Sequence, residues 1–82
     1  GKEKLQSVTN IYEKKIKIIE KEIADLDHKI EVIYMDRLNN AIGIDTYNKI
    51  SNKFEEQKEQ FQKELIELKE NYEDYKNNNH VL

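Results

Sequence analysis

Few side chains in this sequence are of the types and spacings that do chemistry together. The two histidines, His28 and His80, lie far apart in the chain, and His28 sits beside two aspartates on a polar helical face, which favours solvated surface over a metal site. Neither Ser7 nor Ser51 has a histidine at a spacing that would build a nucleophilic triad. We therefore expect no catalytic residue, no metal ligand, no bound cofactor and no enzymatic activity in this chain.

The composition indicates solvated amphipathic helices rather than a thick globular core. Of 82 residues, 38% are charged and 37% are hydrophobic, and no proline and only two glycines are present to interrupt a helix. A net charge of -3 without any basic cluster argues against a DNA-binding surface. Short apolar runs exclude a membrane span, so we expect a cytoplasmic protein. The start at Gly-Lys-Glu without methionine suggests a piece of a longer protein.

Two stripes of apolar residues run along the chain at coiled-coil spacing and mirror each other about Ile42. The first extends from Val8 to Ile33, and the second from Ile50 to Tyr75. Paired from the outside in, the two residue numbers add up to 83 or 84 at every layer. A constant sum is what an antiparallel pair of helices requires, because the second helix retraces the first at the same rise per residue. The predicted seam contains Tyr12, Ile16, Ile19, Ile23, Leu26, Ile30, Ile33, Ile50, Phe54, Phe61, Leu65, Leu68 and Tyr72.

The sequence thus predicts an all-α fold, a long antiparallel two-helix coiled-coil hairpin, formed as a single unit by residues 1–82. We expect the first helix over about 4–39, the turn over about 40–43, the second helix over about 44–76 and a frayed tail over 77–82. The competing architecture is one continuous helix in a parallel dimer. It would not require the two stripes to mirror each other.

The residues at the mirror point suit a reversal of the chain. Asn40 can adopt the left-handed conformation that ends a helix. Gly43 or Asp45 can cap the next helix, and an acidic residue there complements the helix dipole. We therefore expect a short turn between antiparallel neighbours.

Some residues depart from a simple apolar seam. Gln57 pairs with Leu26, which places a polar residue in the seam, either to fix the register or merely tolerated at a partly exposed layer. A two-helix pair is marginal by itself, so apolar residues off the seam are expected to form a second face that packs against another copy. These residues are Ile11, Ile18, Val32, Met35 and Ile66.

Apolar residues also crowd the expected end of the rod, where two helices have too little surface to bury them all. They either plug the open end of the hairpin or bind a partner protein, with Ile42 and Ile44 as the anchors. The predicted interaction tip contains Tyr34, Met35, Leu38, Ile42, Ile44 and Tyr47.

Seven residues of this region follow a recognisable order: Tyr34, Asp36, Arg37, Leu38, Ile42, Tyr47 and Ile50. The segment resembles the helix-turn-helix tip of the coiled-coil segment in large serine recombinases. The usual run there is an apolar residue, Tyr, any residue, Asp, Lys or Arg, Leu, any residue, Gly, any residue, Ile, a capping Ser or Thr, then an acidic turn leading to Tyr or Phe and a further apolar residue. Asn40 stands where Gly is usual and Gly43 where Ser or Thr is usual, and both can do the same backbone job.

This resemblance implies one part of a larger enzyme. In such recombinases an N-terminal domain carries the nucleophilic serine, a zinc-bearing domain reads DNA, and the coiled-coil arm touches arms on other subunits. We therefore expect a protein–protein interaction arm of a site-specific DNA recombinase, which mediates subunit contacts in the synaptic complex and helps control the direction of recombination. Its partners would be other copies of the arm, with DNA bound only by domains outside this chain. The alternative is a generic structural or oligomerisation coiled coil of an unrelated protein.

Overall fold

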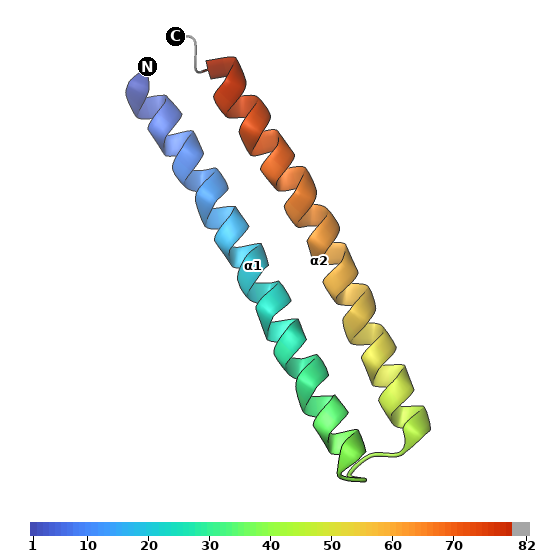
Figure 1. Cartoon of the computed structure of the whole chain (residues 1–82). Coiled ribbons are helices and arrows are strands. Elements are labelled where there is room, and N and C mark those ends of the chain that lie inside the picture. The colour runs from blue at the N-terminus through green and yellow to red at the C-terminus, as the bar shows by residue number, and fades with distance from the viewer. Residues whose placement is uncertain (80–82) are drawn as a thin grey trace.

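The computed structural model describes residues 1–79, which form two long helices joined by a short turn. Helix α1 spans Lys2–Leu38 and helix α2 spans Ile44–Asn79. The start of α1 and the end of α2 lie at one end of a rod, and the turn lies at the other (Figure 1). The rod measures 60 × 16 × 12 Å, about the length of a 37-residue helix at a rise of ~1.5 Å per residue. The prediction of an all-α helical hairpin is therefore confirmed.

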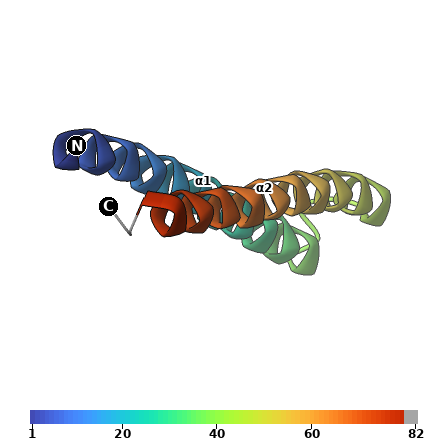
Figure 2. The same cartoon turned by 90° about the horizontal axis from the view of Figure 1, so that it is seen from above.

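The apolar stripes of the two helices face each other. Near the open end Tyr12 stacks on Tyr72, with ring centroids 5.2 Å apart, and nearer the turn the Lys29 ammonium lies 6.0 Å from the centroid of the Phe54 ring. The residue numbers add up to 84 in the first pair and 83 in the second, so the register is the same at both places. Viewed from above, the helices cross rather than run exactly alongside each other (Figure 2), as expected when apolar residues repeat every ~3.5 positions.

A seam between only two helices buries little surface. Leu26, with 4% of its surface exposed, is the one buried residue within the described part of the chain. The other predicted seam residues are half-buried: Tyr12, Ile16, Ile19, Ile23, Ile30, Ile33, Ile50, Phe54, Phe61, Leu65, Leu68 and Tyr72.

The layer beside Leu26 differs from the prediction. Gln57 is exposed, so it is not the polar seam residue that the pairing places there. The neighbouring Lys58 is half-buried instead, and its ammonium pairs with Asp27 Oδ1 at 2.6 Å. A lysine accommodates such a position because its aliphatic stem lies along apolar surface while its charge stays paired at the edge. The hydrogen bond to Asp27 raises the pKa of Lys58 above its usual value.

Helix α2 continues to Asn79, three residues beyond the predicted end at Lys76. The Asn79 side chain donates a hydrogen bond from Nδ2 to the carbonyl oxygen of Tyr75 at 2.7 Å, and Lys76 in the last turn complements the negative end of the helix dipole. Residues 77–79 are therefore helical rather than frayed. The rest of the predicted tail, 80–82, lies outside the described residues.

Helix α1 ends in a Schellman motif, the arrangement in which two N–H groups beyond the helix satisfy its last carbonyls. The N–H of Asn40 donates to the carbonyl oxygen of Arg37 at 3.1 Å, and the N–H of Ala41 donates to that of Asp36 at 2.8 Å. The motif needs one left-handed residue, and Asn40 supplies it with φ 58°. Asparagine tolerates this conformation better than other residues that carry a Cβ, so the predicted role of Asn40 matches its geometry.

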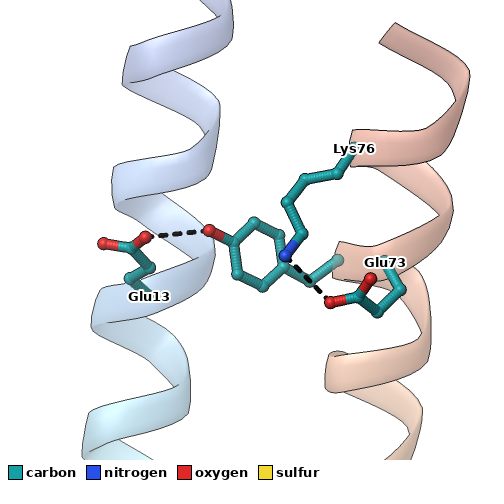
Figure 3. Close-up of polar contacts among 4 residues, drawn as sticks. Glu13, Glu73 and Lys76 are labelled. Carbon is teal, nitrogen blue, oxygen red and sulfur yellow. Dashed lines mark hydrogen bonds and ion pairs between the residues drawn. The ribbon is translucent and has the colours of Figure 1, made fainter. Parts of the chain in front are cut away.

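A group of polar contacts, which we call the basal clasp, joins the helices near the open end of the hairpin. The Tyr72 hydroxyl donates to Glu13 Oε1 at 2.8 Å, which links α2 to α1. The Lys76 ammonium lies 4.2 Å from the centroid of the Tyr72 ring and pairs with Glu73 at 2.8 Å (Figure 3). The hydrogen bond to Glu13, with a smaller contribution from burial, raises the pKa of the Tyr72 phenol above its usual value.

Replacing Asn40 tests the turn. Asn40→Ala places an ordinary Cβ in the left-handed conformation, so we expect the free energy of unfolding to fall by about 1 kcal/mol. Asn40→Gly removes the Cβ, and we expect a hairpin at least as stable as the wild type. Thermal unfolding followed by circular dichroism at one protein concentration measures both. Equal stability of the alanine and glycine variants would contradict the left-handed turn.

The basal clasp predicts a dependence of stability on alkaline pH. Because the pKa of Tyr72 is raised in the folded state, its contribution is fully present below about pH 10 and is lost as the pH rises through the folded-state pKa. The Tyr72→Phe variant should therefore lose less stability than the wild type between about pH 9 and pH 12. Tyr34→Phe, at an exposed tyrosine far from the clasp, is the matched control and should follow the wild type. A parallel loss in wild type and Tyr72→Phe would refute this role.

Candidate functional site at the hairpin tip

The six predicted tip residues fall into two groups. Ile42 and Tyr47 are half-buried. The other four are more than half exposed, and we call them the tip patch: Tyr34 (51%), Met35 (52%), Leu38 (56%) and Ile44 (52%).

The half-buried pair lies where it helps to build the turn. The carbonyl oxygen of Gly43 accepts the N–H of Tyr47 at 2.9 Å, which makes Gly43 the N-cap of α2. Ile42 precedes this cap and Tyr47 is the fourth residue of the helix, and apolar residues at these two positions commonly pack together as a hydrophobic staple. Ile44 is thus the more accessible of the two expected anchors, because Ile42 is drawn into the turn.

The end of α1 and the start of α2 together position the tip patch. Tyr34 and Leu38 are four residues apart, and Met35 and Leu38 are three apart, so these side chains are neighbours on the surface of α1. Leu38 is the last residue of α1, and Ile44 is the first residue of α2. The turn therefore brings Ile44 to the same end of the rod as the three residues of α1.

Charges around the tip balance each other. Between residues 33 and 50 the acidic groups are Asp36 and Asp45, and the basic groups are Arg37 and Lys49. The Arg37 guanidinium points back into the turn, where Nη1 donates to the carbonyl oxygen of Ile42 at 3.2 Å. Asp45 lies in the first turn of α2, where its charge complements the helix dipole. The formal charges of the tip therefore cancel, and the exposed apolar side chains lie in a surface without net charge.

The histidines and serines that were candidates for a metal site or a nucleophilic triad are not brought together. His28 and Ser7 are exposed, Ser51 is half-buried on the other helix, and His80 lies outside the described residues. Within residues 1–79 no group of three or more His, Cys, Asp or Glu side chains is placed to hold a metal ion. Over the same range, neither helix is both long enough and apolar enough to cross a membrane.

The five predicted off-seam apolar residues are all exposed, and one of them, Met35, belongs to the tip patch. The exposed fraction is 53% for Ile11, 57% for Ile18, 45% for Val32 and 60% for Ile66. Ile18 lines a shallow groove between the helices, whereas Ile66 is not among the residues that line it. This groove was not predicted, because it is built from both flanks of the seam. Applying the mirrored pairing to flanking positions would have indicated it.

Comparison with known proteins adds no relative. No family model, no curated protein and no solved structure matches this chain. The resemblance of residues 33–50 to serine recombinases thus stays a prediction. A role for the chain has to be argued from the geometry of the tip.

Proposed function

We propose that this chain is a protein–protein interaction arm of a site-specific DNA recombinase, and that its tip patch contacts the tip patch of a second copy. The observation that carries the proposal is the gathering of four large apolar side chains, each more than half exposed, between residues 34 and 44. Single exposed apolar residues are ordinary on protein surfaces. A cluster of them at the end of a charged rod is typical of a binding site.

The charges favour a protein partner over DNA. With a net charge of -3 the chain repels phosphates overall. The balanced charges around the tip do not oppose the approach of an identical tip, and contact between two tip patches would remove apolar surface from water on both sides. A second copy is therefore a suitable occupant of this surface.

The backbone of the turn supports the resemblance to the recombinase arm. The left-handed residue, Asn40, falls where that family usually has Gly. The N-cap, Gly43, falls where the family usually has a capping Ser or Thr. At both positions where the chain departs from the family pattern, the residue present can take the backbone role of the usual one: the left-handed conformation at Asn40 and the N-cap at Gly43.

The rod shape also suits such an arm. A hairpin 60 Å long separates the tip from the end where the chain enters and leaves. In the parent enzyme this would carry the contact away from the domains that cut and bind DNA, so arms on different subunits meet and hold paired DNA sites together. The arm would then help to set the direction of recombination in the cytoplasm, without a catalytic residue or cofactor of its own.

A structural coiled coil of an unrelated protein is the second candidate function. The observation that favours it is the groove along the flank, because a structural coil associates along its length rather than through its tip. Only the recombinase arm requires contact between tip patches, whereas a structural coil associates along its length without one.

Disulfide trapping distinguishes the two contact points. The chain has no cysteine, so Asn48→Cys, at an exposed position near the turn, introduces a single thiol that reports on contact between tips. We expect disulfide-linked dimers to form readily, and the Leu38→Ser/Ile44→Ser double variant to lower tip affinity by about tenfold or more, because two apolar side chains no longer become buried. Helicity should be unchanged, since both residues are exposed.

The matched control is Ile66→Ser, which removes an equally exposed aliphatic side chain far from the tip. It should leave the rate of trapping at residue 48 as in the background protein. Unchanged trapping in the Leu38→Ser/Ile44→Ser variant, or the same loss in Ile66→Ser, would refute the tip as the binding site.

A further inference from the structure

A second surface lies along one flank of the rod, away from the tip. It is a shallow groove between the helices with a volume of about 320 Å³, and its apolar lining consists of Ile18 and Ile19 from α1 and Leu68 from α2. Ile19 and Leu68 belong to the seam but are only half-buried. Ile18 stands at the rim with 57% of its surface exposed. Two helices alone leave this part of the seam open to water.

The charged residues on the two walls of the groove are opposite in sign. The α1 wall carries Lys15, and the α2 wall carries Glu64 and Glu67. A second copy related by a two-fold axis along the rod would lay its α1 wall over the α2 wall of the first. In that arrangement each Lys15 faces the carboxylates of the other copy, so the groove is complementary to itself.

The antiparallel register places the paired charges of the two copies at the same level along the rod. Lys15 lies at the level of Leu68 along the rod, because the paired residue numbers add up to 83 or 84. Glu67 is therefore at the height of Lys15 in either copy. Neighbouring helices of the two copies run in opposite directions, as in a four-helix bundle.

The geometry points to a lengthwise dimer in which two copies pair groove to groove, with both tips at the same end. Each Ile18 inserts over Ile19 and Leu68 of the other copy, and Lys15 pairs with Glu64 and Glu67 across the interface. The contact covers the open side of the seam, which the hairpin leaves half-exposed. This surface is separate from the tip patch, so each arm has two independent contacts.

Ile66 provides a matched control on the same stretch of rod. It is 60% exposed, against 57% for Ile18. Glu64 and Leu68 line the groove two residues to either side of it. Since two residues turn a helix by about 200°, Ile66 points away from the groove. Replacing Ile66 thus removes the same kind of side chain at the same height without touching the proposed interface.

Sedimentation velocity over a range of concentrations tests the groove and separates it from the tip. The wild type, with two kinds of contact, should form species larger than a dimer. Ile18→Asp should stop at the tip-to-tip dimer, and Leu38→Ser/Ile44→Ser should stop at the groove dimer. The variant that combines all three changes should stay monomeric. Ile66→Asp should behave as the wild type.

A charge exchange adds a readout that loss of folding cannot imitate. Lys15→Glu in the tip-deficient background should weaken the groove dimer about tenfold or more. Adding Glu64→Lys and Glu67→Lys to the same chain should restore it. The inference is overturned if Ile18→Asp associates as the wild type does, or if Ile66→Asp weakens association as much as Ile18→Asp. It is also overturned if the charge exchange does not restore association. If instead the tip variant associates as the wild type while Ile18→Asp is monomeric, the groove stands and the proposed tip contact falls.

Discussion

The left-handed conformation of Asn40 is the constraint on which the rest of this structure depends. With φ 58° at this single residue, the carbonyls at the end of α1 are satisfied within the turn and the chain reverses at once. Because α2 then retraces α1, every cross-helix contact inherits its register from this point. A shift of one residue in the turn would rotate each facing side chain by about 100° and separate Tyr12 from Tyr72. It would also move Ile44 away from the end of α1.

A rod of two helices cannot enclose a core, and its exposed apolar surfaces follow from this limit. Only Leu26 is buried within residues 1–79. Cross-helix polar contacts, such as those of Lys58 and Tyr72, lie along the edges of the seam, where exposed ion pairs and hydrogen bonds supply little stability. Apolar side chains that the hairpin leaves uncovered gather at the tip and along the groove, while Ile11, Val32 and Ile66 are exposed elsewhere on the rod. The tip and the groove are the surfaces where another protein would gain most by binding.

The sequence predicted the hairpin and its point of reversal because both depend on local and periodic features: mirrored spacing, and an asparagine and a glycine between the stripes. The apolar spacing wrongly placed Gln57 in the seam, because steps of three and four residues from Phe54 fit positions 57 and 58 equally well. Only the packing of the two helices shows that the stem of Lys58 takes this place. The clasp between Glu13 and Tyr72 and the flank groove were not predicted, since each requires the rotation of both helices about their axes. At the tip, composition identified the apolar cluster, but burial was needed to separate the turn-building Ile42 from the exposed Ile44.

The most direct measurement is the concentration dependence of backbone amide chemical shifts in the intact hairpin. If the tip patch binds a second copy, the resonances of Tyr34, Leu38 and Ile44 should shift progressively as the protein is concentrated, whether or not those of the groove residues also shift. Chemical shifts at the tip that do not change with concentration, even while resonances elsewhere on the rod do, would contradict a binding tip.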